Sequence, residues 1–563
     1  DNPAGDPTPP MLIQTAINFL SPGRIINIED GTYAERLVID KFLTLDGTSE
    51  IGTILDGSSL VGLGSGIIIN SAITNVTIQD LTIKNFAGNL PNAYAGIYAM
   101  NGNNNLTVKN CTIKDNVGGC GFYANGPVNL VTLDNLDVSG HTAAFGAARG
   151  IVIWNGFKEK ISITNCDVYN NNCCGIELQD GTASGVTMSN NNVHNNGDNG
   201  FGISGLKGGS GANVISNNIV ADNGRFGIEI KNPIGNGLSS GDGSIYLDNN
   251  TVTFTPSVGM NIRDHAGIAI FRRAFQPGNP DGYPNIPSGV VVKNNTIDGY
   301  KHLNPVRIES EGFGIVVEGI NNEVSANTIK NSDIGIQQQG GGHPNPNYSA
   351  NNSGDGDQSD NKSASYFGRG NSPVACGNDI SGNTFITNGL NQRTAAPGSG
   401  GSGFVTNTST LEVFCSIQAA IDDPNTMNGH TLIVNPGTYV ENLLINKELT
   451  LLGPNANIDP CNDLRAPEAV IVPAIADFNG ISAYSIIDVQ ASNVTIKGFT
   501  IDGDNPAINT GFSSTNGADI DIAVGITRYV TGDNINISNN IVQNLSYFGL
   551  ELYDYPAGIP SSS

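Results

Sequence analysis

The chain has little of what several common classes of protein require. Its 563 residues include one Trp, five Met and six scattered His, and its 26 Lys and Arg stand against 51 Asp and Glu, for a formal net charge of −25. A chain of this charge lacks the basic face that nucleic-acid binding needs. It also lacks an apolar run of about 18 residues, so no segment is predicted to span a membrane.

Glycine is abundant instead, with 72 residues, and one short phrase recurs. The phrase alternates apolar and polar residues, which is strand periodicity, and Asn, Gly or Asp bounds it, as expected of tight turns. Copies read VTIQDLTI at 76–83, LTVKNCTI at 106–113, VTLDNLDV at 131–138, ISITNCDV at 161–168 and VTMSNNNV at 186–193. Between them Gly precedes an apolar residue at Gly96, Gly121, Gly150, Gly175, Gly202 and Gly227.

A period of 25 to 29 residues with short strands predicts a solenoid of stacked coils. A leucine-rich repeat has a similar period, but its Leu-x-x-Leu-x-Leu frame is absent. An Asn run falls at one turn, where stacked side chains are expected to hydrogen-bond up a column: Asn110, Asn135, Asn165, Asn190, Asn217, Asn249 and Asn294. On these phrases the chain resembles the right-handed parallel β-helices of the pectin-lyase-like superfamily, which implies an all-β fold.

One longer phrase occurs twice. GTYAERLVIDKFLTLDG at 31–47 returns as GTYVENLLINKELTLLG at 437–453. Each copy follows a short amphipathic segment and a turn, so we expect a short capping helix at the N-terminal end of each of two β-helices in tandem. The first is predicted at 1–387, a Gly/Ser-rich linker at 388–404, and the second at 405–563, where it looks incomplete, as in a fragment of a longer chain.

The same phrase resembles the opening of pectin methylesterases, with Glu35 and Glu441 at equivalent positions. The catalytic motifs of that family and of the polygalacturonases are absent. Both Glu residues are therefore interpreted as structural.

Strand alternation turns a set of large polar and aromatic side chains outward on one sheet face. They are Tyr98, Tyr123, Trp154, Glu177, Gln179, Glu229 and Lys231. Aromatic rings beside hydrogen-bonding groups suit a sugar chain, so this ladder is a predicted glycan-binding face. The alternative is a solvated sheet face with scattered aromatics.

Two further sites have weaker signals. Asp264 and His265 resemble the Asp-His segment of pectate lyases, and Arg307 supplies a candidate base, against the alternative of a solvated loop with ordinary ion pairs. A polar loop offers hard oxygen ligands for Ca²⁺: Asp355, Asp357, Ser359 and Asp360. It lacks the Gly and Glu of an EF-hand loop, which favours the alternative of a flexible polar loop. Among the cysteines, Cys111, Cys166, Cys120 and Cys174 are expected as core thiols, and Cys415 is expected to be able to pair with Cys461.

Two functions of different class follow. The first is a secreted or cell-surface β-helix protein, a non-enzymatic adhesin or polysaccharide-binding stalk. It resembles large surface proteins of the Bacteroidota, which implies contacts with other surface or secretion-system proteins. The second is a polysaccharide lyase or hydrolase of an unrecognised family acting on an acidic glycan.

Overall fold

The computed structural model describes residues 12–88, 95–143, 148–256, 265–271, 286–303, 312–339, 375–395, 403–461, 464–481, 484–529 and 533–553. The chain divides into two compact units. Unit 1 contains Asp1–Pro373 and Asp379–Ala395, and unit 2 contains Val374–Asn378 and Ala396–Ser563. Each unit is a stack of parallel strands entered by a short helix, so the expected all-β fold of two tandem β-helices is confirmed.

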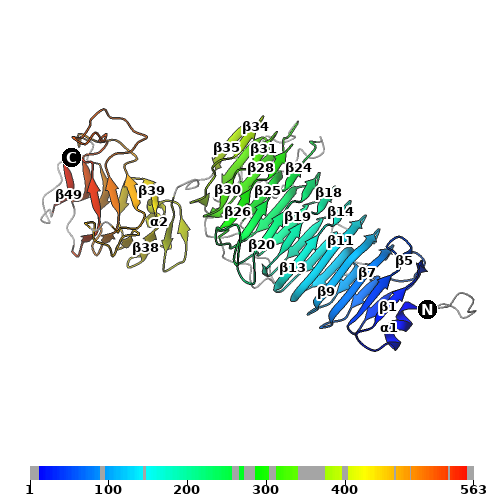
Figure 1. Cartoon of the computed structure of the whole chain (residues 1–563). Helices are drawn as coiled ribbons and strands as arrows, with labels where there is room; N and C mark the ends of the chain where they lie inside the picture. The colour runs from blue at the N-terminus through cyan, green and yellow to red at the C-terminus, as the bar shows by residue number, and fades with distance from the viewer. Residues whose placement is uncertain are drawn as a thin grey trace, which may run out of the picture. The chain divides into compact units, whose positions relative to one another are not determined.

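Each coil of unit 1 passes through three rows of strands (Figure 1). Row 1 contains β1 Ile25–Ile28, β4 Leu43–Gly47, β7 Thr74–Lys84, β9 Asn104–Lys114, β11 Val128–Ser139, β13 Lys158–Thr164, β17 Thr187–Ser189, β20 Asn213–Ser216, β23 Ile245–Asp248, β26 Val290–Lys293 and β30 Glu323–Ser325. Row 2 contains β2 Gly31–Tyr33, β5 Thr53–Asp56, the second halves of β7, β9 and β11, β14 Asp167–Tyr169, β18 Asn192–His194, β21 Ile219–Ala221, β24 Thr251–Thr253, β27 Thr296–Asp298, β31 Thr328–Lys330 and β34 Thr384–Ile386. Since β7, β9 and β11 run through both rows, the two form one sheet.

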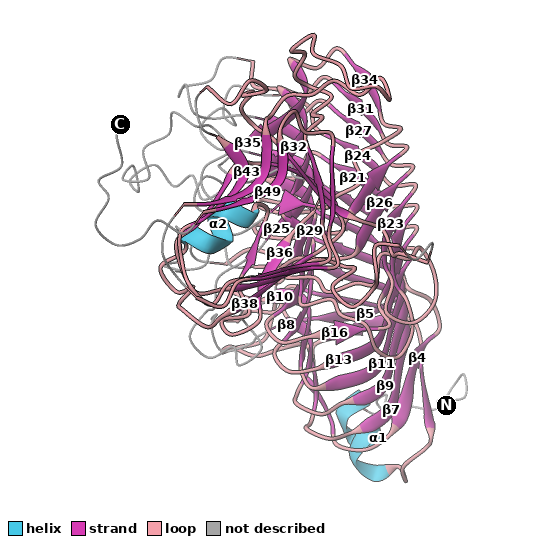
Figure 2. Cartoon of the chain, turned by 90° about the vertical axis from the view of Figure 1, so that its left-hand side faces the viewer, coloured by secondary structure: helices cyan, strands magenta, loops and turns pink. Residues whose placement is uncertain are grey.

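Row 3 is a separate 12-stranded sheet. It contains β3 Leu37–Ile39, β6 Ile67–Ile69, β8 Ala95–Ala99, β10 Cys120–Asn125, β12 Ile151–Trp154, β15 Ile176–Gln179, β19 Phe201–Ser204, β22 Phe226–Lys231, β25 His265–Phe271, β28 Gly312–Val317, β32 Ile334–Gln339 and β35 Leu390–Ala395. Figure 2 shows the strands of this unit lying side by side along the stack. The inward Val, Ile and Leu of all three rows form one continuous core cluster.

Unit 2 repeats this plan with fewer coils. Its three parallel rows are β38 Thr431–Val434, β41 Thr450–Leu452, β44 Thr495–Lys497 and β47 Asn536–Ser538; β39 Gly437–Val440, β42 Ala469–Val472, β45 Thr500–Asp502 and β48 Ile541–Gln543; and β40 Leu443–Ile445, β43 Ser485–Val489, β46 Val524–Arg528 and β49 Phe548–Leu552. Two antiparallel strands, β36 Val405–Asn407 and β37 Val413–Phe414, extend the first row. Unit 2 has its own core cluster.

The end of unit 1 differs from the predicted boundary. Residues Leu390–Ala395 form β35 and pair in parallel with β32, although the linker was predicted from residue 388. The sequence LNQRTA shows no alternation of apolar and polar residues, so it gave no sign of a strand. In the structure Leu390, Asn391 and Gln392 are all exposed. The division between the units therefore falls after Ala395.

The repeated phrase holds a helix across the first coil of each unit. The helices are α1 Ile13–Phe19 and α2 Ile417–Asp422. The Glu35 carboxylate accepts hydrogen bonds from the backbone N–H groups of Ile13 and Gln14, at 2.9 and 3.0 Å. A helix leaves its first N–H groups without intrahelical partners, and a carboxylate is a favourable acceptor there. Glu35 is thus structural, as expected.

Glu441 does the same in the second copy. It accepts from the N–H groups of Ile417 and Gln418 at 2.8 and 2.7 Å, and from the hydroxyl of Ser416. The Lys of each phrase bonds the other helix end: Lys41 Nζ donates to the Asn18 and Leu20 carbonyls, and Lys447 Nζ to those of Ile421 and Asp423. The phrase is therefore repeated because each unit needs one cap.

The Asn run marks the outward half of a two-residue turn. All seven residues have φ between 51° and 58°, the left-handed region that Asn tolerates better than most residues. Some bond along the column as expected: Asn135 Nδ2 donates to Asn110 Oδ1 at 3.0 Å and Asn249 Nδ2 to Asn217 Oδ1 at 2.7 Å.

The stronger ladder is the next residue, which points inward. Asn191, Asn218, Asn250, Asn295 and Asn327 are at most 1% exposed. From Asn218 to Asn327, each Oδ1 accepts from the backbone N–H and the side-chain amide of the Asn one coil before it, as Asn218 does from Asn191 at 3.0 Å in both bonds. Asn191 Oδ1 accepts from the backbone N–H of Cys166, which holds this position one coil earlier, at 3.0 Å. Each Nδ2 also donates to a backbone carbonyl. The buried Asn side chains thus pair the turn backbone, which would otherwise lie in the core without partners.

The cysteines confirm the expected core thiols but not the expected disulfide. Cys111 and Cys166 are free and buried, as predicted. Cys415 forms a disulfide with Cys376, with 5.7 Å between the Cα atoms, and the exposed Cys461 is free, so the pairing of Cys415 with Cys461 was wrong. Spacing along the chain could not reveal this, because Cys376 precedes the second unit's phrase by a long stretch of sequence. No helix within the described ranges is long and apolar enough to cross a bilayer.

The helix caps give a first prediction. Leu12 precedes α1 and provides no side-chain cap, whereas Ser416 caps α2 by accepting from Ala419 N–H at 3.1 Å. Glu35→Ala should therefore cost α1 about 1–2 kcal/mol and speed its amide hydrogen exchange roughly tenfold. Glu441→Ala should affect α2 less. Equal effects of the two substitutions, measured by exchange and mass spectrometry, would contradict this account.

The buried ladder gives a second prediction. Asn218→Ala removes the bonds to Met188 O and Asn250 Oδ1 and those accepted from Asn191. Leaving these buried groups unpaired should lower the free energy of unfolding by on the order of 3 kcal/mol. The control is its neighbour Asn217, which is exposed with φ 56°. Asn217→Gly should be close to neutral. Similar urea midpoints for the two variants would count against a structural role for the ladder.

Candidate functional site

The seven predicted glycan-contact residues all lie on the outer face of row 3. Ile97 and Ala99 belong to the core cluster, so Tyr98 between them points outward. The register places Tyr98, Tyr123, Glu177 and Glu229 in one column, with Val152 and Gly202 filling the intervening coils. Trp154, Gln179 and Lys231 stand in the neighbouring column, with Ser204 between the last two.

This face is less exposed than the alternation predicts. Tyr123 is 9% exposed, Glu177 5% and Glu229 1%, whereas Tyr98, Trp154, Gln179 and Lys231 are partly exposed. Tyr123 packs with Ala95, Cys120 and Val152 in an apolar cluster of its own outside the core. Strand periodicity reports which way a side chain points, but not what else lies against that face.

Three aromatic rings lie on successive coils of this face. The ring centroids of Tyr98 and Tyr123 are 5.4 Å apart in an edge-to-face arrangement, and those of Tyr123 and Trp154 are 6.4 Å apart and nearly stacked. The Arg149 guanidinium lies 4.9 Å from the centroid of the Trp154 ring. The indole Nε1 donates to Asp180 Oδ2 at 2.7 Å, which fixes the ring. We call Tyr98, Tyr123, Trp154 and Arg149 the aromatic patch.

A set of charged groups adjoins the aromatic patch. Arg149 Nε donates to Glu177 Oε2, and Lys231 Nζ lies 3.8 Å from the other oxygen of the same carboxylate. Lys231 also donates to Gln179 Oε1 at 2.8 Å. The side chains of Arg149 and Lys231 retain 17% and 12% of their exposure. The predicted residues Glu177, Gln179 and Lys231 are therefore brought together, while Glu229 instead accepts from Asn199 Nδ2 at 2.6 Å.

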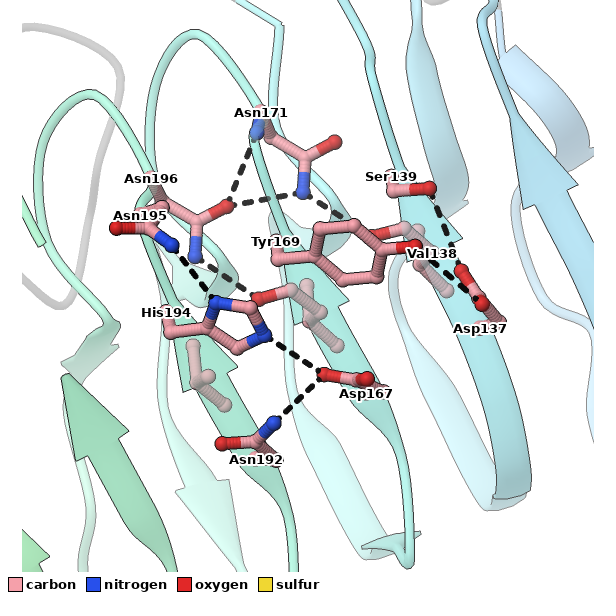
Figure 3. A network of polar contacts seen from close by, with 12 residues as sticks. Asp137, Val138, Ser139, Asp167, Tyr169, Asn171, Asn192, His194, Asn195 and Asn196 are labelled. Atoms are coloured by element: carbon pink, nitrogen blue, oxygen red, sulfur yellow. Dashed lines mark hydrogen bonds and ion pairs between the residues drawn. The ribbon is translucent and has the colours of Figure 1, made fainter. Parts of the chain in front are cut away.

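A second polar cluster lies on row 2 and was not predicted (Figure 3). Asp137 and Asp167 are direct neighbours on adjacent strands, and the rings of Tyr169 and His194 stack with centroids 5.0 Å apart and planes 1° from parallel. His194 Nε2 and Asn192 Nδ2 lie 3.1 and 3.0 Å from Asp167 Oδ1. Two carboxylates, an imidazole and a phenol thus meet on one outward face.

Asp137 is the member of this cluster whose ionised form is disfavoured. Burial raises the pKa of its carboxyl above the ordinary value, and repulsion from Asp167 and Glu50 adds to the shift. Ser139 Oγ and Tyr169 Oη donate to it at 3.3 and 3.5 Å, which only partly offsets these effects.

The sequence did contain a signal for this pair. Asp137 and Asp167 occupy the same place in two successive phrases, where the neighbouring coils have Thr112 and Asn192. Aligning the phrases as stacked columns, and not only as strands, would have placed the two carboxylates side by side.

The predicted lyase residues fall mostly outside the described ranges. Asp264 and Arg307 lie there and remain untested. His265 opens β25 and is 2% exposed, with its ring centroid 4.7 Å from that of Phe254 and 4.5 Å from that of His302. Little of its surface is left for a substrate.

The buried His302 pairs with the partly exposed Asp333 beside His265. His302 Nδ1 lies 3.0 Å from Asp333 Oδ2, which also accepts from the backbone N–H groups of His302 and Gly312. Burial alone would raise the pKa of Asp333, but these hydrogen bonds hold it below the ordinary value. These hydrogen bonds connect two neighbouring coils, which points to a structural role for the pair.

The predicted calcium ligands also lie outside the described residues: Asp355, Asp357, Ser359 and Asp360. A Ca²⁺ site there stays a prediction.

Comparisons with known proteins were consistent with the coil architecture. A family model described as a right-handed β-helix region matches residues 43–208 and 149–353, which together exceed half of the chain. A cell surface glycoprotein of Methanothermus fervidus is 34% identical over 156 residues, 28% of this chain and 20% of the relative. The chain thus matches only about a fifth of that relative's length. The resemblance to Bacteroidota surface proteins stays a prediction.

Several solved structures are similar at low identity. The A-module of a mannuronan C-5 epimerase from Azotobacter vinelandii is 14% identical with a TM-score of 0.39, covering 69% of this chain and 94% of that one. A GH87 α-1,3-glucanase catalytic domain in complex with nigerose is 18% identical with a TM-score of 0.43, covering 67% and 64%. A family 28 exopolygalacturonase of Yersinia enterocolitica is 15% identical with a TM-score of 0.36, covering 58% and 70%.

The raised pKa of Asp137 predicts how its removal depends on pH. A carboxyl whose pKa is higher in the folded than in the unfolded protein destabilises the fold at neutral pH, and this penalty disappears once pH falls below both values. Asp137→Asn should therefore raise the melting temperature at pH 7 by about 1–2 °C and have no effect below about pH 3. The control is Asp298→Asn in row 2, since Asp298 pairs with Lys330 at 3.3 Å and should give no gain. A gain that is independent of pH would contradict the assignment.

Proposed function

Because the chain belongs to the right-handed β-helix family, we propose that it is a cell-surface protein that binds an extended polysaccharide on the outer face of row 3. The stack acts as a rigid, non-enzymatic stalk or adhesin. The name of the similar protein from Methanothermus fervidus, a cell surface glycoprotein, supports the extracellular location. Contacts with other surface or secretion-system proteins belong to the same proposal.

The aromatic patch carries this proposal. Three rings on consecutive coils, with Tyr98 and Trp154 partly exposed, offer stacking positions across two adjacent columns. The C–H-rich faces of sugar rings stack on aromatic faces, and sugar hydroxyls take hydrogen bonds from adjoining polar groups. Arg149, Gln179 and Lys231 supply such groups beside the rings.

The charges favour an uncharged glycan. Next to the patch, Arg149 and Lys231 are matched by Glu177 and Asp180, so no net positive charge is left to attract a polyanion. The chain as a whole carries −25, which repels acidic polymers at low ionic strength. We therefore expect neutral polysaccharides to bind better than acidic ones.

Substitution of the patch tests this. Trp154→Ala should weaken binding of a neutral polysaccharide about five-fold in isothermal titration, since a lost stacking contact is worth about 1 kcal/mol. Trp154 is the only Trp, so its fluorescence reports binding in Tyr98→Ala, where a similar loss is expected. The control is Phe157→Ala on the same coil, because Phe157 is 39% exposed and faces Lys207 at 5.7 Å but lies outside the patch.

Dextran, xylan and laminarin serve as neutral polymers, and alginate and polygalacturonate as acidic ones. Equal losses in Phe157→Ala, or wild-type protein that binds none of them, would contradict the proposal. New reducing ends or unsaturated sugar ends would instead support the lyase or hydrolase alternative.

A further inference from the structure

A compact group of three potential metal ligands joins two neighbouring coils. Cys173 and Cys174 immediately precede β15, and Asp198 precedes β19 on the next coil. Their ligand atoms all lie within 4.8 Å of one another. We propose that Cys173, Cys174 and Asp198 bind a thiophilic divalent cation of the zinc class. This site is independent of the proposed glycan-binding function.

The spacing of the ligand atoms fits a tetrahedral ion. The two sulfurs are 3.8 Å apart, and Cys174 Sγ lies 3.9 Å from Asp198 Oδ2. With Zn–S bonds of about 2.3 Å, a tetrahedral zinc ion holds two thiolates about 3.8 Å apart, and a thiolate and a carboxylate oxygen about 3.6 Å apart. An ion could therefore be accommodated with only small shifts of Asp198.

The backbone holds these ligands in place before any ion binds. Asp198 N–H donates to the Cys173 carbonyl at 3.0 Å, and Gly175 N–H donates to the Asn199 carbonyl at 2.9 Å. Both sides of the group are thus fixed by the hydrogen bonds that set the coil register. A ligand set held on two rigid coils loses little conformational freedom on binding.

Burial gives an independent reason to expect a cation. Cys173 is 9% exposed and Cys174 2%. Asp198 Oδ1 is buried and has no hydrogen-bond donor. A buried carboxylate oxygen without a donor is costly, and a cation bound at Oδ2 of the same carboxylate would offset that cost by neutralising its charge.

Charge balance also suits a divalent ion. Thiols bind metal as thiolates, so with both cysteines deprotonated the three ligands carry three negative charges, which a divalent ion largely neutralises. Metal binding is therefore accompanied by release of the thiol protons.

The donor set determines the class of ion. Thiolates select zinc and cadmium over calcium and magnesium, which prefer oxygen alone. Three protein ligands leave a fourth position for water or another oxygen. This differs from the all-oxygen calcium site predicted from Asp355 onwards.

Cadmium binding tests the proposal on the full chain, kept reduced. Wild-type protein should bind one equivalent of Cd²⁺ with the ultraviolet charge-transfer absorption of thiolate–cadmium bonds, and Zn²⁺ should displace it while Ca²⁺ should not. Cys173→Ser and Cys174→Ser should each lose most of this absorption, and Asp198→Asn should keep it with affinity lowered about tenfold. The control is Cys461→Ser, because Cys461 is the exposed free cysteine and should not contribute.

Trp154 fluorescence and circular dichroism confirm that each variant is folded. If the serine variants do not fold, the test rests on the Cd²⁺ affinity of Asp198→Asn compared with that of the wild-type protein, and an unchanged affinity would contradict the proposal. Absence of stoichiometric Cd²⁺ binding, absorption that depends on Cys461, equal competition by Ca²⁺, or a Cys173–Cys174 disulfide that survives reduction would each overturn the proposal.

Discussion

The constraint on which the rest of this structure depends is the pairing of buried turn backbone from one coil to the next. At the turn between rows 1 and 2, part of the backbone faces the interior, where an unpaired N–H or C=O is costly. Asn191, Asn218 and Asn250 meet this need by accepting from the preceding coil and donating to a carbonyl. Between Asn191 and Asn327 a slipped register would leave these groups unpaired, so the ladder also fixes the register of those coils. Equivalent residues of neighbouring repeats are thereby stacked into columns.

Stacking leaves the first coil of each column uncovered, and each unit covers it with the same phrase. An uncovered first coil exposes apolar side chains and strand edges. Glu35 and Glu441 hold a helix over that coil through its N-terminal N–H groups, and Lys41 and Lys447 bond its other end. With separate caps and separate core clusters, each unit has its own complete means of starting a stack.

The sequence predicted the fold well because period, strand alternation and turn residues all report local conformation. It placed the Asn ladder one residue early, because the left-handed Asn at 217 is as visible as the buried Asn at 218. The sequence pattern placed Gly202 in the same column as Gly175. In the structure Ile176 pairs with Phe201, so the glycine that aligns with Gly175 is Gly200. The sequence could not show that Glu177 and Glu229 are buried, because strand alternation predicts which way a side chain points and not which neighbours pack over it. Nor could spacing reveal the Cys376–Cys415 disulfide.

In this scaffold, functional groups are therefore brought together in columns of equivalent positions on stacked coils, and not in continuous sequence motifs. Most outward positions of row 2 near Asp137 hold Thr or Asn, which stack without charge repulsion. Two Asp residues in succession cost electrostatic energy, and the structure surrounds them with hydroxyls, an amide and an imidazole. The aromatic patch and the Cys173–Asp198 group arise in the same way, from side chains far apart in sequence that the register sets one or two coils apart. Substituting a single column on an unchanged ladder is enough to add a site, because the backbone that positions it is already fixed.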